Sequence, residues 1–89
     1  MQKEMNFERK RWLLNRIRFR IQRENGAETR KDKATAKERS REEILQIIGL
    51  LHFYGLDLVK PQGKDLATRG KRISALKALR KVLQSIQER

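Results

Sequence analysis

The stretch Ile44-Leu-Gln-Ile-Ile-Gly-Leu-Leu-His-Phe-Tyr54 is the most apolar part of the chain, and only Gln46, Gly49 and His52 interrupt its large apolar side chains. A helix that is apolar on almost every side must be covered from several directions. This segment is too short to cross a bilayer, which takes about 20 residues. We therefore expect a central helix that lies in the core, or in a core and an interface.

The residues before this segment offer two starts for the central helix. Thr35-Ala-Lys-Glu38 and Ser40-Arg-Glu-Glu43 both match the capping-box pattern, in which a hydroxyl and a carboxylate bond to free backbone amides. Residues 25–37 are mostly charged or small and show no apolar periodicity, so we expect a mobile basic connector there. The central helix is accordingly predicted over residues 38–54.

Amphipathic patterns lie on both sides of the central helix. Residues 6–24 contain no Gly or Pro, and one face carries Phe7, Leu13, Leu14, Ile17 and Ile21. This pattern predicts a first helix that ends at Asn25-Gly26. In residues 71–87, apolar side chains recur at intervals of three and four, at Ile73, Leu76, Leu79, Leu83 and Ile86, which predicts a last helix.

Residues 55–70 hold the only Pro and three of the five Gly, so we expect a loop between the last two helices, with at most a short helical turn. The outer helices have one apolar stripe each and can cover the central helix from two sides. We therefore predict an all-α fold, a small three-helix domain formed by residues 1–89.

The charge of the chain indicates a polyanionic ligand. Its 89 residues include 23 Lys and Arg against 11 Asp and Glu, which gives a net charge of +12. The excess lies at the two ends, with +8 in residues 1–41 and +7 in residues 60–89, whereas residues 42–59 carry −3. DNA or RNA is the first expected partner, because phosphate contacts release counterions.

The residue types argue against catalysis and for a reducing compartment. The chain has no Cys, which removes disulfides and thiolate chemistry. Its one His, His52, has no carboxylate or nucleophile at a spacing typical of catalysis. No nucleotide-binding or metal-binding motif occurs. We expect a cytoplasmic protein that is not an enzyme, needs no cofactor or metal and does not enter a membrane; if a phage encodes it, it acts in the host cytoplasm.

A second stripe on the first helix is the strongest candidate site. Met5, Trp12 and Phe19 are spaced by seven residues, nearly opposite the Leu13 and Ile17 face. Arginines alternate with them at Arg9, Arg16 and Arg23. Trp12 with Arg16, and Phe19 with Arg23, pair an aromatic ring with a guanidinium, which suits stacking on bases and contacts to phosphates. The same pairs could anchor a protein partner, or pack within the fold.

Basic residues of the last helix extend the candidate site. Lys71 and Arg72 lie near the expected start of this helix, and Lys77 and Lys81 lie outside its apolar stripe. We expect all four to contact phosphates in preference to base edges.

The chain resembles a phage accessory recombination protein of the anti-RecBCD type, a class that binds a host nuclease-helicase. The resemblance rests on the basic start Phe7-Glu-Arg-Lys-Arg-Trp12, on the apolar segment from Ile44 to Tyr54 and on Leu58-Val-Lys-Pro-Gln-Gly63. It implies docking on a host DNA-processing complex near its DNA path, and it identifies no site residues.

Three functions therefore remain open. The first expectation is a non-catalytic modulator of DNA processing or recombination that binds a host protein complex. The alternative is a protein that binds DNA or RNA directly, through phosphate contacts and aromatic stacking. A third alternative is a homodimeric structural protein whose second stripe is covered by another copy.

Overall fold

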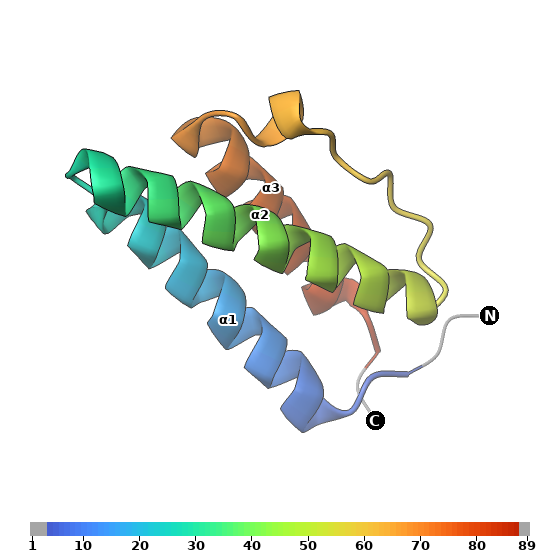
Figure 1. Ribbon diagram of the computed structural model, residues 1–89. Helices are drawn as coiled ribbons and strands as arrows, with labels where there is room; N and C mark the ends of the chain where they lie inside the picture. Colours follow the sequence, from blue (N-terminus) through green and yellow to red (C-terminus); the bar gives the residue numbers. More distant parts are fainter. Residues whose placement is uncertain (1–3, 88–89) are drawn as a thin grey trace.

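Three α-helices and one short 3₁₀ helix make up the computed structural model, which describes residues 4–87. They are α1 (Phe7–Gly26), α2 (Arg30–Phe53), the 3₁₀ helix η1 (Gly63–Leu66) and α3 (Arg69–Ser85). Each of the three α-helices packs against the other two, and α3 lies behind α1 and α2 in Figure 1. The prediction of a small all-α three-helix fold is confirmed.

The start of α1 exchanges the expected roles of Met5 and Phe7. Asn6 caps the helix, and its side-chain oxygen accepts hydrogen bonds from the amides of Glu8 and Arg9. Because the chain is extended at the cap, Met5 turns back into the core, where its amide donates to the Gln87 carbonyl at 3.1 Å. Met5 is therefore buried instead of lying on the exposed stripe, and Phe7 is 45% exposed instead of lying in the core.

The start of α2 corrects the expected connector, because residues 30–37 are helical and the link between α1 and α2 is only residues 27–29. Thr29, and neither Thr35 nor Ser40, is the cap: its hydroxyl accepts from the Asp32 amide at 3.0 Å. The buried face of α2 continues toward its start through Ala36 and Ser40. These small side chains allow α2 to pack closely against its neighbours. Because they are not large apolar residues, they leave no apolar periodicity in the sequence.

The core lies between the three α-helices and is closed from above by η1 (Figure 1). Its members include Leu13, Ile17, Ile44, Ile47, Leu51, Leu66, Leu76, Leu79 and Leu83. Gly55 follows α2 with a φ of 86°, which suits a residue without a side chain. The loop from Gly55 then returns along the bundle to η1, and α3 begins at Arg69, capped by Thr68.

Buried charged side chains connect α1 to α3 through hydrogen bonds. Arg72 donates two hydrogen bonds to the Glu24 carboxylate, at 2.7 and 3.0 Å, and a third to the Leu66 carbonyl at 3.0 Å. Lys10 donates to the carbonyls of Gln84 and Ile86, at 3.3 and 2.8 Å. The carbonyls at the end of a helix lack intrahelical partners, so Lys10 caps the end of α3.

Candidate nucleic-acid interface

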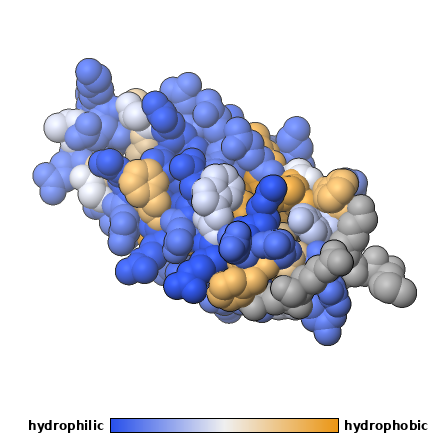
Figure 2. All heavy atoms as spheres, turned by 90° about the horizontal axis from the view of Figure 1, so that it is seen from below, coloured by the Kyte–Doolittle hydropathy of each residue, from blue (hydrophilic) through white to orange (hydrophobic). Residues whose placement is uncertain are grey.

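An exposed row of aromatic and basic side chains runs along α1. We call it the aromatic-arginine stripe, and it consists of Arg9, Trp12, Arg16, Phe19 and Arg23. All five residues are exposed, and Trp12 is 56% exposed. Figure 2, which views the molecule from the α1 side, shows isolated apolar side chains set in a hydrophilic surface. The alternative in which Trp12 and Phe19 are packed within the fold is therefore wrong for Trp12 and incomplete for Phe19, which is 41% exposed.

Arg16 lies beside Trp12 and is held there from α2. Its Cζ atom is 5.7 Å from the Trp12 ring centroid, within the range of a cation-π contact. Its Nη2 and Nε atoms lie 2.6 and 2.9 Å from one carboxylate oxygen of Glu43. Glu43, whose side chain is 8% exposed, thus fixes the guanidinium next to the indole ring. The indole itself stays open to solvent.

Phe19 lies against two guanidinium groups. The Cζ atoms of Arg20 and Arg23 are 5.1 and 5.0 Å from its ring centroid. The expected pairing of Phe19 with Arg23 is present, and Arg20 joins it. Because two guanidinium groups already lie against the Phe19 ring, we expect Phe19 mainly to position these cations. Trp12 is the more exposed ring and is better placed for stacking.

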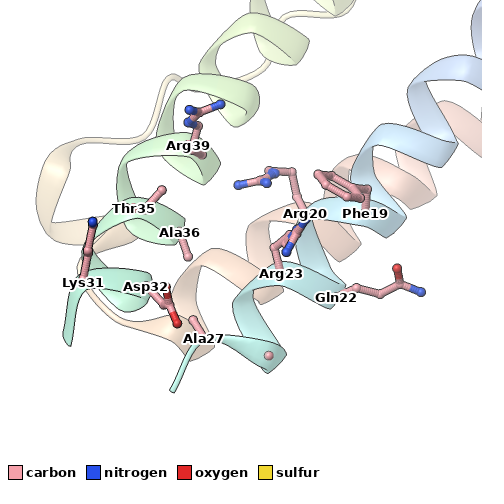
Figure 3. A pocket seen from close by; sticks show the side chains of 11 residues that line it. Phe19, Arg20, Gln22, Arg23, Ala27, Lys31, Asp32, Thr35, Ala36 and Arg39 are labelled. Carbon is pink, nitrogen blue, oxygen red and sulfur yellow. The ribbon is translucent and has the colours of Figure 1, made fainter. Parts of the chain in front are cut away.

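A groove between the second half of α1 and the first half of α2 begins at Phe19, and we call it the arginine groove. It has a volume of about 480 Å³, and four basic side chains line it, Arg20, Arg23, Lys31 and Arg39, against the one acid, Asp32. Figure 3 shows Arg20 reaching from α1 towards α2, which carries Arg39, while Asp32 lies beside Ala27 at the other end. The groove is therefore strongly positive at the end near the stripe.

Arg20 is the unusual residue of the groove. Its side chain is buried, with 8% exposed, and its Nη1 atom has no hydrogen-bond partner within the part of the chain that the structure describes. Burial lowers the pKa of its guanidinium; Glu43 opposes this shift, and the nearby charges of Arg16, Arg39 and Arg23 add to it. A buried donor without an acceptor costs free energy, so a ligand that supplies acceptor oxygens would be favoured here.

The basic residues expected on the last helix do not join this face. Lys71, Lys77 and Lys81 are exposed, but Lys77 and Lys81 lie on the side of α3 opposite its buried residues. Because α3 packs behind α1 and α2 (Figure 1), these two residues lie on a different helix from the aromatic-arginine stripe and outside the face of α3 that packs on the core. Lys71 lies near the start of α3, where its Nζ donates to the Lys64 carbonyl at 3.1 Å.

Arg72 is not a surface residue, which corrects its expected contact with phosphate. It is only 5% exposed, and three hydrogen bonds occupy its guanidinium. The reason is helical spacing: Arg72 lies four residues before Leu76, so it falls in line with Leu76, Leu79 and Leu83 on the buried side. Its role is to hold α3 against α1.

Three basic residues of the arginine groove, Arg20, Lys31 and Arg39, were not predicted from the sequence. Arg20 lies three residues after Ile17, so it falls within the apolar stripe of α1, and a charge in such a stripe is a usable signal. Arg39 lies inside the expected central helix, but its place beside α1 is a contact between helices, which spacing within one helix does not show. The groove appears only when α2 begins at Arg30.

A second exposed feature lies at the opposite end of α2. Phe53 is 62% exposed and Val59, in the following loop, is 91% exposed. The half-buried residues Tyr54, Leu56 and Leu58 lie between them in sequence and pack at the edge of the core. Of the two expectations for the apolar helix, burial in the core alone does not hold at its last turn, where His52 is also exposed.

Among residues 4–87, no group of three or more His, Asp and Glu side chains is placed to hold a metal ion. Within the same range, none of the helices has both the length and the apolar content needed to cross a membrane. Comparison of the chain with protein-family models, with curated proteins and with solved structures finds no match.

Proposed function

We propose that this chain is a non-catalytic nucleic-acid-binding protein that holds a single strand along α1. In this proposal Trp12 stacks on a base, while Arg9, Arg16 and Arg23 contact phosphates. The observation that carries the proposal is the exposed Trp12 ring, with Arg16 held beside it by Glu43. Stacking needs an unpaired base, so single-stranded DNA or RNA is favoured over duplex.

The net charge of +12 supports the same ligand class, because neutralising phosphates supplies most non-specific affinity. The aromatic-arginine stripe adds what charge alone does not. It offers one ring for a base and several guanidinium groups for the strand on either side of that base. Proteins that bind single strands without sequence preference combine these two elements.

The single Trp of the chain allows a direct test. Intrinsic fluorescence is followed while single-stranded DNA, single-stranded RNA or a DNA duplex is added at constant salt. We expect the Trp12 emission to be quenched by the single strands and much less by the duplex, because only an unpaired base can stack on the ring.

The matched variants are Trp12→Ala and Phe53→Ala, which each remove an exposed aromatic ring from α1 or α2. Fluorescence anisotropy of a labelled strand should show affinity reduced by about 5- to 150-fold in Trp12→Ala and unchanged in Phe53→Ala. Circular dichroism should show the same helicity in both. Equal affinity of Trp12→Ala and the unsubstituted chain would contradict the proposal.

The exposure of Phe53 and Val59 favours a second candidate function. This is a modulator of DNA processing or recombination that binds a host nuclease-helicase near its DNA path. Large exposed apolar side chains can anchor a protein contact, and a phosphate binder has no need of them. The tagged chain would be used to capture partners from nuclease-treated bacterial lysate at about 0.3 M salt, where exposed charges are screened.

Recovery of one stoichiometric DNA-processing complex, lost in Phe53→Ala and kept in Trp12→Ala, would support the modulator. If no protein is recovered while purified strands bind and quench Trp12, direct nucleic-acid binding is the function. Trp12 lies on α1 and Phe53 is the last residue of α2, so each function has its own sensitive residue.

A further inference from the structure

The arginine groove concentrates more positive than negative charge. Four basic side chains line it against Asp32, which lies at the end remote from Arg39. Glu43, the carboxylate nearest the other end, is bonded to Arg16. Glu43 still attracts Arg20, but Arg16, Arg39 and Arg23 repel it.

Arg20 makes this arrangement costly to the fold. It is buried near Arg16, Arg39 and Arg23, whose repulsion Glu43 opposes, and its Nη1 atom has no acceptor within residues 4–87. A side chain at this position with no charge would avoid both the repulsion and the unmet hydrogen bond. Interactions that oppose folding in this way occur mainly at functional sites, where a ligand relieves them.

We propose that the arginine groove binds one phosphate group, held by Arg20, Arg23 and Arg39. The inference rests on the proposed function and deepens it, because it gives the strand a fixed point next to Phe19. Guanidinium groups bind phosphate oxygens through paired, charge-assisted hydrogen bonds. A phosphate supplies the acceptors that Arg20 lacks, once its guanidinium turns towards the groove.

The shape of the groove fits this ligand. Its volume of about 480 Å³ exceeds what one phosphate needs and leaves room for an attached sugar. Arg20 and Arg23 come from α1 and Arg39 from α2 (Figure 3), so a bound phosphate would join the two helices across their gap. The groove should then stabilise the folded chain whenever it is occupied.

The first experiment follows thermal unfolding in inorganic phosphate against sodium chloride at equal ionic strength. We expect a saturable rise in Tm, of roughly 5–10 °C at about ten times the Kd. Arg39→Gln should weaken the phosphate response about tenfold or more, and it should not disturb packing, because Arg39 is exposed. Lys77→Gln, which removes the same charge from α3, should respond as the unsubstituted chain does.

Arg20→Met separates a binding role from a structural one. If Arg20 serves the ligand, this variant should have an equal or higher Tm in chloride and should lose the phosphate response. If Arg20 serves the fold, its Tm in chloride should fall, which would overturn the proposal. An absent phosphate response, or one weakened equally by Arg39→Gln and Lys77→Gln, would also overturn it.

Two sources of the phosphate are distinguished by oligonucleotides with a 5′-phosphate or a 5′-hydroxyl and the same sequence. A terminal phosphate predicts tighter binding of the first, with this advantage lost in Arg39→Gln. An internal phosphodiester predicts equal binding of both, with both weakened by Arg39→Gln. If Arg39→Gln weakens neither, the groove does not hold the strand and the inference fails.

The failure of the inference is separable from the failure of the proposed function. If strands bind and quench Trp12 while Arg39→Gln has no effect, the function stands and the groove site falls. If phosphate raises the Tm through Arg39 while no strand binds, the groove site stands and the function falls.

Discussion

At the scale of single residues, we expect the buried ion pair of Glu24 and Arg72 to be highly sensitive to substitution. Glu24 is 1% exposed and Arg72 is 5% exposed. Removing one partner leaves a buried charge uncompensated, which costs about 3–5 kcal/mol. We expect Arg72→Met to lower the free energy of unfolding by that amount, measured by urea denaturation with circular dichroism.

The double variant Glu24→Leu with Arg72→Met is the matched control, because it removes both charges and keeps apolar volume. We expect it to lose much less than the single variant, since no unpaired charge remains. Lys77→Met, an exposed lysine of the same helix, should change stability by less than about 0.5 kcal/mol. A stable Arg72→Met chain would show that Arg72 does not hold α3 to α1.

Ser40 allows an opposite prediction, namely a gain in stability. It is fully buried in α2, and its hydroxyl has no hydrogen-bond partner among the described residues. Ser40→Ala removes an unmet polar group and improves helix propensity, so we expect the free energy of unfolding to rise by about 1 kcal/mol. The exposed Ser74→Ala in α3 measures the propensity part alone. A loss in Ser40→Ala would be the result expected of a capping serine, and would contradict the structure.

At the scale of elements, the first turns of α2 depend on their cap. Residues 30–35 are all exposed, so packing contributes little there. Thr29→Ala should cost about 0.5–2 kcal/mol and should reduce amide-exchange protection in the first two turns. Thr35→Ala should leave protection unchanged or raise it, because Thr35 lies inside the helix. The reverse result would place the start of the helix at residue 35 and restore the connector.

Large apolar side chains explain why most of the fold could be predicted from sequence. The stripes that contain Leu13 with Ile17, and Leu76 with Leu83, have helical spacing and do lie in the core. The early start of α2 could not be predicted in the same way. Its buried residues there are Ala36 and Ser40, which also occur on exposed helix faces, and its cap is a single Thr29 hydroxyl.

Some features of the candidate site could also be predicted from the sequence, and others could not. Trp12 with Arg16, and Phe19 with Arg23, follow from spacing within one helix, and their ring contacts are present. Arg72 was misplaced because the carboxylate that pairs with it, Glu24, lies on another helix. The arginine groove depends on how α1 and α2 lie together, which is a tertiary property. Contacts within one helix are therefore predictable from the sequence, whereas contacts between helices require the fold.

At the scale of the whole molecule, the net charge of +12 can attract a nucleic acid to all of the surface, or the strand can bind only the charges of one face. The aromatic-arginine stripe and the arginine groove involve α1 and α2, whereas Lys77 and Lys81 are exposed on α3, outside its buried face. A strand lying along α1 would touch only the first set. The salt dependence of the binding constant is then set by the number of phosphate contacts on this face and not by the total charge of the chain.

This view predicts different results for two variants that each remove two positive charges. On single strands, log K falls with log salt by about 0.7 per phosphate contact, so Arg9→Gln with Arg23→Gln should reduce the slope by roughly 1.4. Lys77→Gln with Lys81→Gln should leave the slope nearly unchanged. Both slopes come from anisotropy titrations of the same labelled strand at several salt concentrations. If the two variants reduce the slope equally, the strand wraps around the molecule or binds without a preferred face. If only the lysine variant reduces it, the binding face is α3, and the ring of Trp12 must serve another partner.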